Sequence, residues 1–177
     1  IDFSCHAKLV DGLIRIDGIA IQAYLESVGL NSLQEKFKLP FIAVTHNYNK
    51  TLSIVQNYCS KNKLDCVQYK PVLDHIGKRI QITFQSNLVA IILDHHNRCL
   101  PVKSYNNIQI GSFQVVMYYI LALDLVCDLA PTHVITKQVV HILWHYLLKA
   151  KHIFIKSKQK NSLFDTMIAE CVGYKSV

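Results

Sequence analysis

The longest apolar run in the chain, GSFQVVMYYILALDLVC at residues 111–127, constrains the fold more than any other feature. It approaches the length of a membrane span, but Gln114 and Asp124 interrupt it, and a span needs about 18 or more residues with few or no charges. A second long segment with an apolar stripe at helical spacing follows the residues APTH. We therefore expect two buried helices, over 112–129 and 133–157, and no association with a membrane. Thr132 is the expected N-cap of the second helix.

The first 107 residues contain shorter and more β-rich segments. LIRIDGIAI has the alternation of a strand with a turn at Asp17-Gly18, and a short helix ending at Gly29 follows it. A further helix is expected over 50–62, capped by Thr45 or Asn49. The runs DCVQYKPV, KRIQITF and LVAIILD predict a hairpin or meander.

These segments predict an α+β fold. A small antiparallel β region over residues 1–107 is followed by a helical half over 108–177, and the two halves form one packed unit. A last helix is expected over SLFDTMIAEC, ending at Gly173. Half of the residues (51%) are hydrophobic, so the chain can bury a substantial core.

Positive charge is concentrated near the C-terminus. The formal net charge is +7, and no acidic residue occurs between Asp128 and Asp165. Six lysines lie in that interval: Lys137, Lys149, Lys151, Lys156, Lys158 and Lys160. Clustered positive charge favours a polyanion, of which nucleic acid is the commonest. A solvated helix face, with lysines at the negative end of the helix dipole, is the alternative reading.

Three groups of residues suggest metal or phosphate chemistry, and we interpret each as structural. In LDHHNRCLPV, the adjacent His95 and His96 would point to opposite faces of a strand, so a strand end leading into a loop is favoured over a metal site. His141 and His145 have the spacing of zinc ligands on a helix, but an apolar stripe surrounds them and partly buried structural histidines are favoured. Gly111-Ser112 resembles the start of a nucleotidyltransferase signature, but the carboxylates that follow are not two residues apart on a strand. No metal site is predicted from these groups.

Six cysteines are scattered without a close pair. A secreted disulfide scaffold is normally shorter and richer in cysteine. We therefore expect a reducing, cytosol-like compartment.

Several motifs, in their order, resemble a known family. The run YKPVLDHIGKRIQITFQSNLVAIILDHHNRCLPV is followed by IQIGSFQVVMYYILAL and then by HILWHYLLKAKHIFIKSKQKNSLFDTMIAECVG. Over residues 45–173 this succession resembles the region after the catalytic core of the poly(A) polymerases of large cytoplasmic DNA viruses. The resemblance implies a nucleotidyltransferase-like C-terminal portion. It also implies that Arg98, Cys99 and Pro101 are structural.

The resemblance also defines what this sequence lacks. The family transfers AMP to an RNA 3′ end with three carboxylates and two metal ions. Its Gly-Ser turn and first two carboxylates lie upstream of the matched part, and only Asp2 corresponds to the third, catalytic carboxylate. Asp2 as an ordinary polar residue near a terminus is the alternative. Mg²⁺ or Mn²⁺ would bind only if a partner chain completed the site, and otherwise no cofactor is expected.

We therefore expect this chain to be an RNA-binding or accessory half of an enzyme that needs a partner chain. It would contact RNA through Lys149, Lys151, Lys156, Lys158 and Lys160, pack against another protein chain, and show no polyadenylation alone. The expected location is the cytoplasm, which for a viral protein means the host cytoplasm or the virion. A non-catalytic viral structural or assembly subunit derived from the same family is the alternative.

Overall fold

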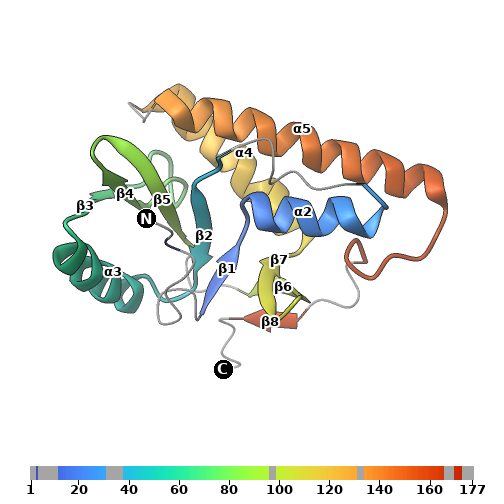
Figure 1. Cartoon of the computed structure of the whole chain (residues 1–177), viewed down its shortest axis with the longest axis horizontal. Helices are drawn as coiled ribbons and strands as arrows, with labels where there is room; N and C mark the ends of the chain where they lie inside the picture. The colour runs from blue at the N-terminus through green and yellow to red at the C-terminus, as the bar shows by residue number, and fades with distance from the viewer. Residues whose placement is uncertain are drawn as a thin grey trace.

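The computed structural model describes Phe3 and residues 12–30, 38–95, 99–130, 134–165 and 170–172. Eight strands form one mixed sheet in the order β3-β4-β5-β2-β1-β7-β6-β8 (Figure 1). The strands are β1 (Leu13–Arg15), β2 (Phe41–Thr45), β3 (Asp65–Tyr69), β4 (Arg79–Phe84), β5 (Asn87–Asp94), β6 (Leu100–Tyr105), β7 (Ile108–Gly111) and β8 (Glu170–Val172). β2 is parallel to β5 and β1 is parallel to β7, whereas the other neighbours are antiparallel.

In the described part of the chain, four helices cover the two faces of this sheet. They are α2 (Gly18–Ser27), α3 (Tyr48–Asn62), α4 (Phe113–Leu129) and α5 (Val134–Ser157). Side chains of α2, α4 and α5 bury one face together with residues of β1, β2, β5, β6 and β7. α3 and Phe3 bury alternate residues of β1, β2, β4 and β5 on the other face. This division follows from the strand geometry, because successive side chains point to opposite faces.

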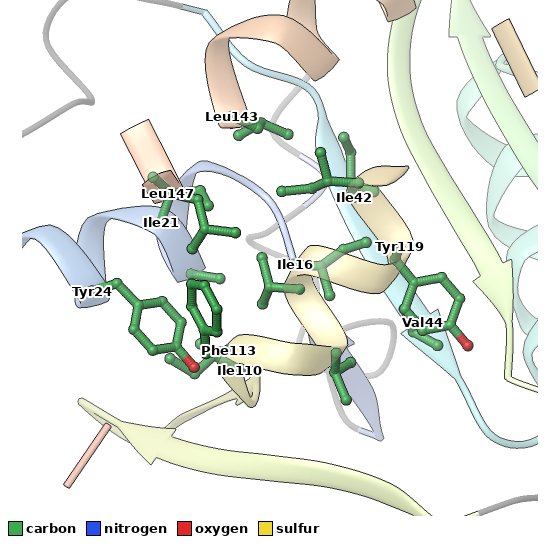
Figure 2. Packing of buried hydrophobic residues seen from close by; sticks show 14 of the residues in the cluster. Ile16, Ile21, Tyr24, Ile42, Val44, Ile110, Phe113, Tyr119, Leu143 and Leu147 are labelled. Carbon is green, nitrogen blue, oxygen red and sulfur yellow. The ribbon is translucent and has the colours of Figure 1, made fainter. Parts of the chain in front are cut away.

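The larger core lies between the sheet and the three helices α2, α4 and α5. Figure 2 shows Phe113 of α4 near Tyr24 of α2, and Ile42 and Val44 of β2 belong to the same buried cluster as Ile16. Leu143 and Leu147 of α5 are fully buried against this cluster. The apolar stripe expected from the sequence is therefore the buried side of α5, and the opposite side of the helix faces solvent.

The helix expectations are largely confirmed, because helical periodicity is a local signal. α4 and α5 fall within one residue of the expected boundaries, and the runs at 65–94 form the antiparallel strands β3, β4 and β5. The expected helix over 162–171 is wrong, since residues 162–164 form a turn and Glu170–Val172 is a strand. Thr132, the expected cap of α5, lies outside the described residues.

Two cap assignments are corrected by the structure. Asn47, not Thr45 or Asn49, caps α3, because its side chain accepts a hydrogen bond from the Lys50 amide at 3.3 Å. Asp17 is the N-cap of α2 and does not belong to a turn within a longer strand. The sheet also includes β7 and β8, so strands on both sides of position 107 contribute to it.

Candidate nucleic-acid interface

The exposed side of α5 carries a row of basic side chains. We call it the basic stripe, and its members, all exposed, are Lys137, His141, His145, Lys149, His152 and Lys156. Successive members are three or four residues apart, so they share one side of the helix. Nineteen residues of helix separate the first member from the last, a length of about 29 Å at about 1.5 Å per residue. The helix α5 that carries the stripe runs along the upper edge of the molecule (Figure 1).

The first part of the basic stripe is neutralised by the neighbouring helix. The Lys137 Nζ lies 2.7 Å from Oδ1 of Asp128 on α4 and donates a hydrogen bond to it. The His141 Nε2 lies 4.0 Å from Oδ1 of Asp124, also on α4. Asp128 raises the pKa of Lys137 through this hydrogen bond and by charge attraction. Charges at this end therefore interact mainly within the protein.

The last part of the stripe has no such partners. Within the described residues, no carboxylate lies within 4.0 Å of the ammonium groups of Lys149 or Lys156, nor of Lys158 and Lys160 just beyond the helix. All four side chains are exposed. Helix C-termini carry a partial negative charge, which one or two lysines suffice to offset. The remaining positive charge is available to an external anion.

Anchored residues hold the segment after α5 in place. The Asn161 side chain donates to Ser27 at the end of α2, at 3.0 Å to its hydroxyl and 3.2 Å to its carbonyl. Phe164 is buried in the larger core. The Lys103 ammonium donates to the carbonyls of Ser162 at 2.8 Å and Asp165 at 2.5 Å. Lys158 and Lys160 consequently lie on a short loop tethered by both ends.

Lys151 differs from the other lysines predicted to bind RNA. Its Nζ lies 4.7 Å from the ring centre of Phe113, 5.1 Å from that of Phe154 and 5.4 Å from that of Phe164. A cation over aromatic faces is stabilised by the negative charge of the ring centres. This side chain is only partly exposed and covers an aromatic cluster, so its contribution is largely to the fold.

The proposed catalytic residue Asp2, together with His96 and Arg98, lies outside the described residues. His95, the residue before His96, has a structural role. Its Nδ1 is hydrogen-bonded to the Tyr119 hydroxyl, and its Nε2 lies 3.2 Å from the Cys99 carbonyl. His95 therefore connects the end of β5 to α4 and to the segment that leads into β6.

Asp94, at the end of β5, is the carboxylate to consider for a two-metal centre in the described residues. Asp94 Oδ2 lies 3.8 Å from the ammonium of Lys78, and Lys78 also lies over the Tyr48 ring at 4.2 Å. No group of three or more histidine, cysteine or acidic side chains is placed for metal binding in the described part of the chain. A cation already occupies the space beside this carboxylate, and these residues do not fit a pair of Mg²⁺ ions.

Sequence reasoning missed the contribution of the histidines. His141 and His145 were expected to be partly buried, but both are exposed members of the basic stripe. Their spacing from Lys137 and Lys149 carried the necessary signal, since positions four apart share a helix face. Ser112 of the nucleotidyltransferase-like Gly-Ser pair is the N-cap of α4, and Asp124 and Asp128 are the residues that neutralise the stripe.

One cysteine does not fit the expectation drawn from cysteine usage. Cys99 is disulfide-bonded, whereas Cys59, Cys66 and Cys127 are thiols that form no disulfide among the described residues. In the described part of the chain, no helix has the length and apolar character needed to cross a membrane.

Comparison with known structures supports the fold. The crystal structure of the Megavirus polyadenylate synthase is similar to this chain, with a TM-score of 0.70 and 11% sequence identity. The similarity covers 96% of this chain and 36% of that chain, so this sequence corresponds to about a third of its length. The expected α+β fold is thereby confirmed, and it is similar to part of that synthase. No protein-family model and no curated protein sequence matches the chain.

Proposed function

We propose that this chain is a poly(A)-polymerase-like unit that binds RNA through the last part of the basic stripe and does not transfer adenylate by itself. The observation that carries the proposal is a group of exposed lysines, at the end of the stripe and in the loop just beyond it, that have no carboxylate partner among the described residues: Lys149, Lys156, Lys158 and Lys160. Lysines placed in a row neutralise consecutive phosphates and release their counterions. The similarity in fold to a viral polyadenylate synthase favours RNA among the polyanions.

The absence of independent catalysis is the second part of this proposal. The transfer reaction needs carboxylates that hold two metal ions, and Asp94 is engaged by Lys78. Another chain would have to supply the remaining ligands for Mg²⁺ or Mn²⁺, with Asp2 as this chain's own candidate. We propose that the RNA-binding function of this chain is located in the cytoplasm. There it would contribute to mRNA processing by a large DNA virus.

The decisive experiment measures RNA affinity at several salt concentrations. The test variant replaces Lys149, Lys156 and Lys158 by Ala. The control replaces Lys50, Lys61 and Lys70, three exposed lysines elsewhere, and so makes the same change in net charge. Fluorescence anisotropy with a labelled single-stranded RNA should show binding that is at least about tenfold weaker in the test variant only. The slope of log K against log salt should fall by about 2, or about 0.7 for each lost phosphate contact.

Equal affinity in the two variants would refute the assignment of the RNA site. The same samples, given ATP with Mg²⁺ or Mn²⁺, should show no extension of the RNA. Extension by the chain alone would refute the second part of the proposal.

A structural or assembly subunit remains the second candidate because of the surface between α4 and α5. Leu121 and Leu148 are about half exposed, and a hollow of about 120 Å³ lies between Leu121, Asp124 and Trp144. Exposed apolar side chains that gather in one place mark protein contacts more often than chance exposure does. A chain that binds no RNA but self-associates in sedimentation experiments, with Leu121→Ser and Leu148→Ser restoring the monomer, would favour this candidate.

A further inference from the structure

A cavity of about 400 Å³ opens beside the carboxyl end of β5. Residues 93–95 form one wall, the segment 75–78 before β4 forms a second, and α4 forms the third. β5 and β2 are parallel neighbours, and ligands of α/β proteins commonly bind beyond the carboxyl ends of such strands. The volume falls within the range of small-molecule sites.

The cavity has apolar and aromatic walls. Leu93, Val115 and Ala122 line it together with Tyr119, and Tyr118 stands at its rim with 52% of its surface exposed. The Tyr118 ring meets the Tyr119 ring in a T-shaped contact at 5.0 Å between ring centres. Its exposed part offers aromatic surface on which a flat ligand can stack. These walls disfavour a highly charged ligand, which would lose its hydration on entry.

Lys78 and Asp94 give the cavity one positive and one negative side chain. Lys78 Nζ and Asp94 Oδ2 are 3.8 Å apart, close enough to attract but beyond hydrogen-bonding distance. The ammonium retains donors and the carboxylate retains acceptors. A ligand edge with a donor and an acceptor side by side would satisfy both groups.

The walls of the cavity are held in place by contacts with each other and with the residues behind them. His95 Nε2 donates to the Cys99 carbonyl, since a carbonyl only accepts, and Nδ1 is then left to accept from the Tyr119 hydroxyl. On the opposite wall, Gly77 has φ +95° and lies against Val126, so that a Cβ at Gly77 would approach Val126 to 2.9 Å. Buried Arg79 donates to the Gly77 carbonyl at 2.9 Å. The site is therefore preformed.

We propose that this cavity binds a nucleobase, stacked on Tyr118 with its hydrogen-bonding edge on Lys78 and Asp94. Nucleobases are flat, uncharged and aromatic, and each presents adjacent donors and acceptors at its edge. Stacking on an aromatic side chain is the usual way in which unpaired bases are held. The choice of ligand rests on the proposed RNA-binding function, whereas the site is separate from the basic stripe.

Adenosine, guanosine, cytidine and uridine are the probes, because they carry a base without phosphates. Their binding to the whole chain is followed by NMR titration, with ribose 5-phosphate as the compound that lacks a base. At least one nucleoside should bind, and Tyr118→Ala should weaken its binding about tenfold. Leu121→Ala is the matched control, since Leu121 is exposed to 48% on the same helix and lies outside the cavity. Lys78→Met and Asp94→Asn should also weaken binding, with the fold intact by circular dichroism.

Each result bears on the proposal. No nucleoside binding at several millimolar, equal binding by Tyr118→Ala, or equal binding of ribose 5-phosphate would overturn it. The variant lacking Lys149, Lys156 and Lys158 distinguishes the two proposals, because it should lose RNA binding and keep nucleoside binding. If neither wild type nor variant binds RNA but both bind the nucleoside, the RNA-binding function fails and the cavity stands. RNA binding without nucleoside binding means that the cavity proposal alone fails.

Discussion

Two regions of the molecule use charged residues for different purposes. At the centre of the sheet, Arg15 and Asp17 are buried and joined by hydrogen bonds of 3.0 and 2.6 Å to one carboxylate oxygen. That oxygen also accepts from the Ile42 amide at 2.9 Å, and the second oxygen accepts from the Ile19 amide at 3.2 Å. Along α5, by contrast, lysines are exposed and those of the last turns have no carboxylate partner in the described residues.

The comparison shows that burial and pairing decide whether a charged side chain stabilises the fold or remains available to bind a ligand. The Asp17 carboxylate ties β1, β2 and the start of α2 together, and Arg15 also lies over the Phe41 ring at 4.1 Å. Loss of either partner would leave the other buried and uncompensated. A lysine at the surface costs nothing in desolvation, so its charge remains available for binding.

The largest effect is therefore expected at the buried pair. Asp17→Ala removes four hydrogen bonds and leaves Arg15 unpaired, so the free energy of unfolding should fall by about 3–5 kcal/mol. Asp128→Ala removes an exposed, solvent-screened pair and should lower the free energy of unfolding far less. Urea denaturation of both variants measures the difference, and similar losses would mean that burial does not distinguish the two regions.

A smaller effect should separate Lys151 from Lys149 on the same helix. Lys151→Met removes the ammonium from the faces of three phenylalanine rings and should lower stability by about 0.5–1 kcal/mol, with little change in RNA affinity. Lys149→Met should do the reverse, because its side chain is exposed. Thermal unfolding and anisotropy on the same two samples provide the check. If Lys151→Met weakened RNA binding as much as Lys149→Met, the aromatic contact would not be its main role.

Sequence reasoning located those parts of the fold that depend on residues close together in the chain. Periodicity located α4 and α5, and lysine clustering located the end of the basic stripe. The pairing of β1 with β7 was not accessible, since Arg15 and Ile110 are far apart in sequence and neither strand specifies its partner. Asp17 was interpreted as part of a turn, although an aspartate just before an apolar helical segment is also a cap signal.

The cavity beside β5 could not be found from the sequence for the same reason. Lys78, Asp94 and Tyr118 come from three separate elements, and only the fold brings them together. Neither does the sequence indicate that Asp124 and Asp128 face the start of α5, because this depends on how two antiparallel helices pack. The distribution of charged residues along the sequence thus located the basic segment. It did not show which half of that segment has no carboxylate partner among the described residues.

The smallest effect tests directly whether Asp124 and Asp128 keep the first part of the basic stripe from binding RNA. Replacing Asp124 and Asp128 together by Asn removes the carboxylates that face His141 and Lys137 while keeping the size of both side chains. The uncompensated part of the stripe would then extend over the whole of α5, and RNA affinity should rise about twofold with a steeper salt dependence. Asp65→Asn with Asp74→Asn, at exposed positions elsewhere, makes the same change in net charge and should leave the salt dependence unchanged. An equal gain in both double variants would mean that RNA responds to the total charge of the protein, and the distinction between the two parts of α5 would have no role in binding.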